Sequence, residues 1–184
     1  DIMIYKIKIK LFSILENFFS LFGLQILYSK KKRMKKNLTI KNIIDVGVAN
    51  GTDFLLENYP KANYLLVEPY KKFHPNIENN LLKIYKGKLF KFAAHNKSEL
   101  KKFYMLDVSS SIIKRKNIRY KHKPIIVKAE KIDIILKNEK ITKNTLLKID
   151  TEGNELNVLK GASKILKKIN FLVVEVRLKN IKTY

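Results

Sequence analysis

The sequence contains no cysteine, and glycine and proline are scarce, at six and four of 184 residues. The absence of cysteine excludes disulfides, cysteine-ligated zinc, iron–sulfur clusters and a cysteine nucleophile. It also fits a reducing compartment, so we expect a cytoplasmic protein. The length predicts one domain with its own core, and a composition of 46% hydrophobic and 30% charged residues is globular rather than disordered.

Acidic residues are also scarce, at 16 against 39 lysines and arginines, which gives a formal net charge of +23. Such a charge favours a nucleic acid or an anionic membrane as partner. Arginine, which binds phosphate through a rigid fork, accounts for only four of the basic residues. The excess of lysine, with abundant isoleucine and asparagine, is typical of an AT-rich genome, and we do not expect a nucleic-acid partner.

The sequence lacks an apolar run suited to span a membrane. The stretch "LFSILENFFSLFGLQILY" at 11–28 is broken by Glu16, Asn17 and Gln25, and no signal-peptide cleavage site follows it. Its apolar residues recur at helical spacing, and "KKKRMKK" comes next. We expect residues 1–39 to form an amphipathic helix and a basic segment. The helix either packs on its own domain or makes a peripheral membrane contact through residues 11–36.

Residues 40–184 alternate between apolar strands and amphipathic helices. We expect strands at 43–46, 64–69, 89–95, 146–150 and 171–176, with an extra strand or hairpin arm in "LKKFYML". Helices are expected at 52–59, in "IENNLLKIY", and along an apolar stripe formed by Leu156, Leu159, Ala162, Ile165, Leu166 and Ile169. This alternation predicts an α/β fold whose mostly parallel sheet is covered on both faces.

The first expected strand runs directly into a loop with two glycines. The segment reads D-x-G-x-A-x-G, from Asp45 through Gly47, Ala49 and Asn50 to Gly51. In an open parallel sheet, ligands bind beyond the carboxyl ends of the strands, and glycine lets the backbone turn sharply and approach a ligand. The spacing differs from the dinucleotide motif G-x-G-x-x-G, which counts against a nicotinamide-dependent enzyme.

Two acids at strand ends narrow the class of ligand. Asp45 beside the loop would repel phosphates, but it suits a cationic or hydrogen-donating ligand. S-adenosylmethionine carries an ammonium and a sulfonium and no phosphate. Glu68 ends the second strand, at about the distance from the loop at which an acid accepts hydrogen bonds from ribose hydroxyls in nucleoside-binding sheets.

A third group of charged residues lies in "LLKIDTEGNELNVLKGA". Under the same rule, Asp150 and Glu152 are expected at the ligand crevice. Asp150 could hold an acceptor hydroxyl, hold a metal or act as a base, and Glu152 is a second catalytic candidate. Glu155 either shares in catalysis or favours a helix N-terminus, and Lys148 could pair with a neighbouring acid.

Histidine and serine carry weaker signals. His95 follows the third expected strand and could face the crevice, although an isolated histidine is more often structural. Ser109–Ser111 fit a polar loop that closes over substrate better than a nucleophile.

The segments "IIDVGVANGTDFLLENYPKANYLLVEP", "FAAH" and "LLKIDTEGNELNVLKGASKILKKINFLVVEV" together resemble the FkbM-type methyltransferase family. The resemblance implies a class I Rossmann-like fold, S-adenosylmethionine as methyl donor, and O-methylation of a saccharide or polyketide hydroxyl. It places the cofactor-binding loop at Asp45, Gly47, Ala49, Asn50 and Gly51. It further assigns the ribose acid to Glu68, another cofactor contact to Ala94, and the acid of the fourth strand to Asp150.

The chain departs from the family pattern in two ways. The family's "D-V-G-A-N-x-G" is here "DVGVANG", which shifts the asparagine to Asn50. Class I folds usually have seven strands, whereas this sequence ends soon after the fifth, so we expect the last strands to be missing and the sheet edge to be open. The alternative function is a catalytically inactive or partial lysine-rich domain that binds RNA or an anionic membrane.

Overall fold

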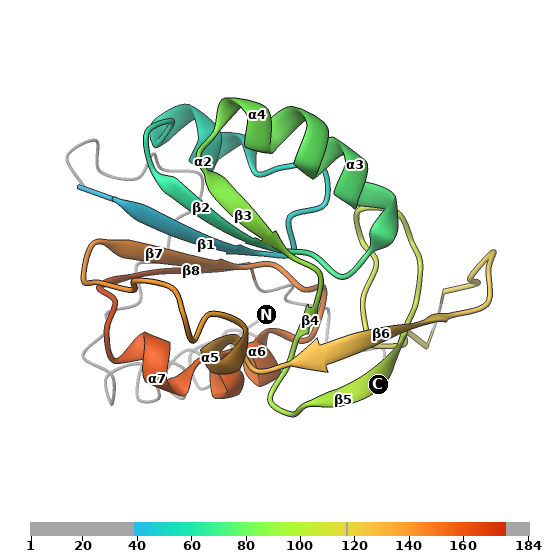
Figure 1. Ribbon diagram of the computed structural model, residues 1–184. Helices are drawn as coiled ribbons and strands as arrows, with labels where there is room; N and C mark the ends of the chain where they lie inside the picture. The colour runs from blue at the N-terminus through green and yellow to red at the C-terminus, as the bar shows by residue number, and fades with distance from the viewer. Residues whose placement is uncertain (1–38, 117, 176–184) are drawn as a thin grey trace, which may run out of the picture. The chain divides into compact units, whose positions relative to one another are not determined.

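The computed structural model describes residues 39–116 and 118–175 (Figure 1). The amphipathic helix and basic segment expected in residues 11–36 lie outside this range and stay a prediction. Within the described residues, none of the helices combines the length and apolar character that crossing a bilayer requires.

A five-stranded parallel sheet forms the centre of the fold. Its order is β3-β2-β1-β7-β8, and every neighbouring pair runs parallel. The strands are β1 (Asn42–Val46), β2 (Asn63–Val67), β3 (Gly87–Phe90), β7 (Thr145–Ile149) and β8 (Phe171–Val174). β7 is buried along its whole length because it lies inside a sheet with helices on both faces. The predicted mostly parallel, Rossmann-like α/β fold is confirmed.

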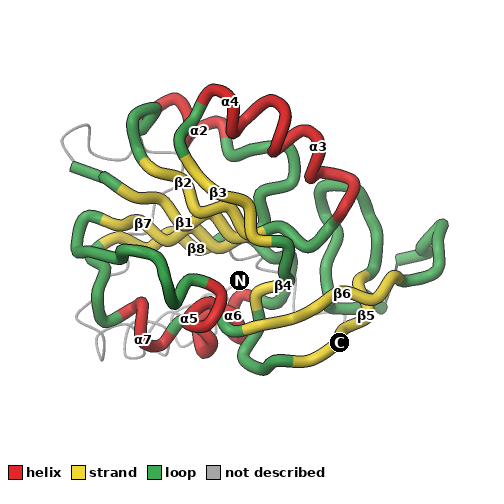
Figure 2. Tube along the Cα trace, viewed as in Figure 1, coloured by secondary structure: helices red, strands yellow, loops and turns green. Residues whose placement is uncertain are grey.

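Helices cover both faces of this sheet (Figures 1 and 2). On one face lie α2 (Asp53–Asn58) and a continuous helical run made of η1 (Lys71–Phe73), α3 (His74–Asn76), η2 (Ile77–Leu81) and α4 (Leu82–Ile84). On the other lie α5 (Ile132–Ile135), α6 (Glu155–Gly161) and α7 (Ser163–Leu166). The helices expected at 52–59 and in "IENNLLKIY" are therefore confirmed.

A second sheet corrects the prediction of one strand at 89–95. The chain leaves β3 after Phe90, and β4 (Ala93–Ala94) joins a separate three-stranded sheet with order β4-β6-β5. β5 (Glu99–Phe103), the expected hairpin arm, runs antiparallel to β6 (Ile125–Glu130), a strand that the sequence analysis missed. Residues 91 and 92 break the strand and carry the chain from one sheet to the other.

The apolar stripe on the last helices is confirmed except at its first member. Leu159, Ala162, Ile165, Leu166 and Ile169 are buried, whereas Leu156 is 53% exposed. α6 instead buries Val158 beside Leu159, and Leu156 points elsewhere because positions two residues apart in an α-helix are separated by about 200° around its axis.

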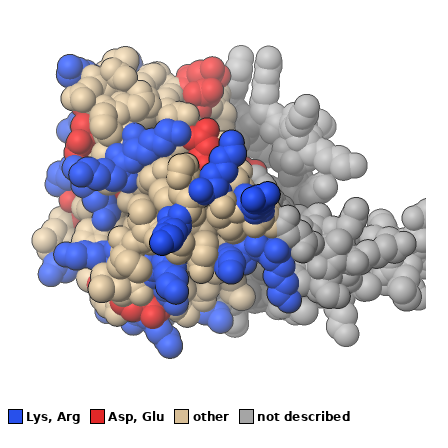
Figure 3. All heavy atoms as spheres, turned by 90° about the vertical axis from the view of Figure 1, so that its right-hand side faces the viewer, with Lys and Arg blue, Asp and Glu red and all other residues tan. Residues whose placement is uncertain are grey.

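Surface charge is uneven over the domain. The side that carries the second sheet shows many lysine and arginine side chains and only small acidic areas (Figure 3).

The central sheet has an edge strand and a point where its chain order reverses. All four residues of β8 are half-buried, and β8 is the edge strand of the described sheet. The chain order reverses between β1 and β7, so the ligand crevice of such a sheet is expected at their carboxyl ends.

Candidate active site

A cavity of about 480 Å³ lies at this switch point. Its volume falls within the roughly 300–1,000 Å³ typical of small-molecule sites. The central sheet, the second sheet and the β5–β6 connection all contribute to its wall. The lining includes the glycine loop, the ends of β2, β4, β7 and β8, and the aromatic rings of Phe54, Phe73 and Phe103.

The glycine loop packs tightly against the end of β7. A Cβ atom on Gly47 would lie 1.8 Å from the carbonyl oxygen of Asp150, and Gly47 has a φ of +81°. Its N–H donates to Val67 O at 3.0 Å, and the loop closes through a 2.8 Å bond from Gly51 N to Val48 O. Only glycine fits at position 47, which explains why the loop after β1 begins with this residue.

Glu68 holds the same loop from the end of β2. Its Oε2 accepts a 3.0 Å bond from Ala49 N, and its Oε1 accepts a 2.8 Å bond from Tyr70 N. Burial raises the pKa of Glu68, while these two backbone donors oppose the rise. Each carboxylate oxygen has a further lone pair, so Glu68 can still accept bonds from two vicinal hydroxyls of a ligand in the cavity.

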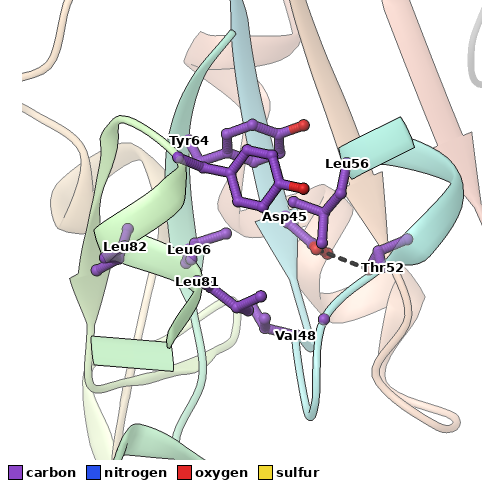
Figure 4. A pocket seen from close by; sticks show the side chains of 10 residues that line it. Asp45, Val48, Thr52, Leu56, Tyr64, Leu66, Leu81 and Leu82 are labelled. Atoms are coloured by element: carbon purple, nitrogen blue, oxygen red, sulfur yellow. Dashed lines mark hydrogen bonds between the residues drawn. The ribbon is translucent and has the colours of Figure 1, made fainter. Parts of the chain in front are cut away.

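Asp45 points away from the large cavity and is not among the residues that line it. Its Oδ2 accepts a 2.7 Å bond from Thr52 Oγ1, and its Oδ1 lies 3.1 Å from Lys148 Nζ. Figure 4 shows the carboxylate beside Thr52, near Leu56 and Tyr64. Burial raises the pKa of Asp45, and the lysine ammonium and threonine hydroxyl oppose it. Asp45 thus ties the end of the loop back to β1.

Lys148 connects the loop to the acids of β7. This buried side chain donates a 3.0 Å bond to Gly47 O, and its ammonium lies 3.7 Å from Asp150 Oδ2 as well as close to Asp45. A single cation therefore compensates two carboxylates, one behind the cavity wall and one facing the cavity.

Asp150 and Glu175 form a pair of carboxyl groups at the ends of neighbouring strands. Ile149 pairs with Val174, and Glu175 N donates to Ile149 O at 2.9 Å, which brings the two acids side by side. Both line the cavity. The charge of Asp150 raises the pKa of Glu175, with burial and a side-chain hydrogen bond between the two groups adding to the effect.

Glu152 is bonded to the β5–β6 connection, which forms part of the cavity wall. Its Oε2 accepts a 2.7 Å bond from Arg115, and the same guanidinium nitrogen donates to Ser109 O at 2.9 Å. Ser111 Oγ donates to Thr151 O at 2.9 Å. These contacts hold residues 107–112, which line the cavity, against the turn after β7, as expected of a polar loop closing over the site.

The structure thus brings most of the predicted site residues to one cavity. Those that line it are Gly47, Ala49, Asn50, Gly51, Glu68, Ala94, Asp150 and Glu152. Asp45 lies behind its wall. His95 is also outside the lining, with Nε2 3.3 Å from Glu99 Oε1 and a pKa lowered mainly by burial. Glu155 is the first residue of α6, where a negative charge favours the helix N-terminus, and it accepts bonds from Thr151 N and Gly153 N in the turn before the helix.

Sequence reasoning missed several residues of this site. Glu175 follows β8, and the strand-end rule that selected Asp150 would have found it. Asn154 is buried and donates a 2.8 Å bond to Ala94 O, which links α6 to β4. Phe103 comes from the second sheet, and no motif or spacing in the sequence connects that strand with the glycine loop.

Charge separates the cavity from the rest of the molecule. In a chain of net charge +23, six acids and a single lysine line the cavity. The acids are Asp53, Glu68, Asp107, Asp150, Glu152 and Glu175. The described residues contain no group of three or more histidine, aspartate and glutamate side chains that could hold a metal ion. Such a lining favours an organic cation over a phosphate ligand.

Residues 45–183 match the family described as methyltransferase FkbM domain. The chain belongs to this family. One similar protein is hexuronic acid methyltransferase AglP of Haloferax volcanii, which is 39% identical over 44 residues. That match spans 24% of this chain and 18% of the relative's length. No solved structure matches the chain.

FkbM methyltransferase domains use S-adenosylmethionine as methyl donor, and the cavity fits this molecule. The lining is acidic, as a ligand with an ammonium and a sulfonium requires. Glu68 lines the cavity and retains lone pairs that can accept hydrogen bonds from a ligand's hydroxyls, and Gly47 and Gly51 leave the loop backbone without side chains.

Proposed function

We propose that this chain transfers a methyl group from S-adenosylmethionine to a hydroxyl oxygen of a saccharide or a related metabolite. The observation that carries the proposal is the acid-lined cavity in which the glycine loop, Glu68 and Asp150 meet. Membership of the FkbM methyltransferase domain family and the similarity to a hexuronic acid methyltransferase support it.

Several parts of the chain would hold the donor. Glu68 would accept bonds from the ribose hydroxyls, and the backbone of Gly47–Gly51 would lie along the donor. Asp45 acts indirectly, because its bonds to Thr52 and Lys148 fix the loop. When bound, the donor supplies an electrophilic methyl group next to the acceptor oxygen.

Asp150 is positioned to handle the acceptor's proton. Its carboxylate faces the cavity and is 28% exposed, so an acceptor hydroxyl can donate a hydrogen bond to it. Lys148 on one side and Glu175 on the other fix its orientation. Removing the proton as the oxygen is methylated is general-base catalysis, and positioning the oxygen lowers the barrier further.

The same acids argue for an uncharged acceptor. A uronic acid bound beside Asp150, Glu152 and Glu175 would bring a further carboxylate among them, and like charges at short range repel. A neutral sugar hydroxyl carries no such penalty. We therefore propose hydroxyl rather than carboxylate methylation for this chain.

The test is transfer of a labelled methyl group from S-adenosylmethionine to a panel of neutral sugars and uronic acids. Asp150→Asn is expected to lower turnover by about 10²–10⁴-fold while donor binding persists. Asp133→Asn, which changes an acid that caps α7 outside the cavity, serves as control and should retain turnover. Methyl transfer to the carboxylate of uronic acids alone, or full turnover in Asp150→Asn, would refute the proposal.

A further inference from the structure

The strands β5 and β6 present two faces of different character. Side chains alternate along a strand, and Phe103, Val127 and Ala129 point inward, where they form a small core with Ala93. The outward positions of the paired region are Leu100 and Lys102 on β5 and Ile126 and Lys128 on β6. All four of these outward residues are exposed.

This outer face combines large apolar groups with cations. Leu100 is 68% exposed and Ile126 is 59% exposed, although a sheet face in contact with water ordinarily carries polar residues. In the strand register, Leu100 lies opposite Lys128, and Lys102 lies opposite Ile126. Each apolar side chain thus has a lysine as its cross-strand neighbour, and none of the four outward residues is an acid.

The surroundings of this face are also basic. Residues 108–129 contain no acid, and the part "KRKNIRYKHK" contributes six lysines and arginines just before β6. The side of the domain that carries these strands shows more lysine and arginine side chains than acidic ones (Figure 3). Within the described residues, neither Lys102 nor Lys128 forms an ion pair, so both charges are available to a partner.

We propose that the outer face of β5 and β6 docks on an anionic lipid surface. Lysines near such a surface are attracted to its headgroups, and apolar side chains between them can enter the boundary with the acyl chains. A nucleic acid would use the lysines but would leave Leu100 and Ile126 in water, and this face offers neither arginine nor an aromatic ring for base stacking.

The docked surface would lie across the small sheet from the active site. Phe103 lines the cavity from the inward face of β5, while Leu100 and Lys102 of the same strand point outward. The membrane would therefore hold the enzyme without closing the cavity. This contact is separate from the one predicted for residues 11–36, and it does not depend on the proposed methyl transfer.

The test is cosedimentation of the full chain with phosphatidylcholine vesicles that contain or lack phosphatidylglycerol. Leu100→Ser with Ile126→Ser keeps the net charge and should lower affinity for the anionic vesicles by about tenfold. The matched control, Ile134→Ser with Leu156→Ser, changes two other exposed apolar residues and should bind as the unchanged chain does.

A second pair of variants separates this face from general attraction by lysine. Lys102→Gln with Lys128→Gln should weaken binding by about 25-fold, since each lysine near an anionic surface contributes roughly a factor of five. Lys164→Gln with Lys167→Gln, on exposed positions of another region, should have a smaller effect. Equal losses in the two pairs would overturn the proposal.

Insertion can be observed directly because the chain has no native cysteine. An environment-sensitive fluorophore on Ile126→Cys should shift to shorter wavelength with phosphatidylglycerol vesicles, while the same label on Leu156→Cys should not. Identical responses from the two labels would overturn the proposal. Unchanged vesicle binding by the Leu100→Ser, Ile126→Ser variant would also overturn the proposal. If light scattering shows in addition that this variant no longer self-associates, the face is a contact between copies of the chain and not a lipid-binding surface.

Discussion

Gly47 is the residue at which the glycine loop and the end of β7 meet. Its missing side chain lets the loop lie against the carbonyl of Asp150, while its N–H bonds to Val67. Gly47, which follows β1, therefore contacts the ends of both neighbouring strands, β2 and β7. A change at Gly47 acts on both halves of the cavity at once.

Gly47→Ala should destabilise the fold by at least about 3 kcal/mol, because a left-handed φ costs an alanine about 1–2 kcal/mol and the Cβ would overlap the Asp150 carbonyl. Gly153→Ala is the matched control. Gly153 also has a positive φ, of +109°, but the nearest atom to its Cβ would be 3.9 Å away. Denaturant unfolding should show a clearly smaller loss for Gly153→Ala, and equal losses would contradict the close-packing argument.

Glu68 gives a prediction about pH. Burial raises its pKa above the ordinary value of 4.5, so between that value and the raised one the folded state binds more protons than the unfolded state. The free energy of unfolding must then fall as pH rises through this window. Glu68→Gln lacks this contribution because the amide does not titrate.

Denaturant unfolding of both proteins from about pH 4 to about pH 7 measures this effect. The stability of the unchanged chain relative to Glu68→Gln should decrease as pH rises. Placing an amide beside Ala49 N and Tyr70 N also changes the free energy of unfolding, but by an amount that does not depend on pH. It therefore does not affect the slope of relative stability against pH. A relative stability that increases with pH would show that the backbone donors outweigh burial.

At the scale of elements, α6 shows why packing overrides local propensity. Gly161 ends this helix, and a Cβ there would lie 2.0 Å from the carbonyl oxygen of His95. The helix therefore approaches the segment after β4 more closely than a side chain allows. Asn154, at the start of the same helix, bonds to Ala94 O, so both ends of α6 fix β4 and one wall of the cavity.

In a helix, replacing glycine by alanine ordinarily stabilises by about 1 kcal/mol. Gly161→Ala should instead lower the free energy of unfolding by about 2 kcal/mol, because the added methyl overlaps backbone. Lys160→Ala, on an exposed position of the same helix, should stay within about 0.5 kcal/mol of the unchanged chain. A gain in stability for Gly161→Ala would mean that α6 can move away from His95.

The strands and helices of the central sheet could be predicted because each is a short apolar run or a helical stripe in a local window. The split of 89–95 into β3 and β4 could not, because "LFKFAAH" contains no glycine or proline to mark a break and only pairing with β6 shows where it occurs. The alternation of apolar and charged residues in "VKAE" is the local signal in the sequence for β6.

The site was predictable where one rule about strand ends applied. That rule placed Gly47, Glu68 and Asp150 at one crevice, as the structure shows. It says nothing of side-chain direction, so it could not show that Asp45 turns toward Thr52 and Lys148. Contacts between distant segments, such as Arg115 with Glu152, leave no trace in a single sequence.

For the whole molecule, the arrangement of charge is the central feature. Lysine and arginine side chains outnumber acidic ones on the side of the domain with the second sheet (Figure 3), while six of the chain's 16 acids line one cavity. The net charge of +23 taken alone favours a nucleic acid or an anionic membrane as partner, but the cavity has the opposite character. The acidic cavity and the basic exterior thus suit different partners, a cationic cofactor and an anionic surface.

The measurement that tests this account most directly is a calorimetric titration of the full chain with S-adenosylmethionine. We predict saturable binding at one site, weakened about 30-fold in Glu68→Gln, because hydrogen bonds to a charged group contribute about 2 kcal/mol. Glu57→Gln, on the exposed surface of α2, should bind as the unchanged chain does. Equal affinity in Glu68→Gln, or no binding by the folded chain, would contradict a cofactor site at the carboxyl ends of β1 and β2.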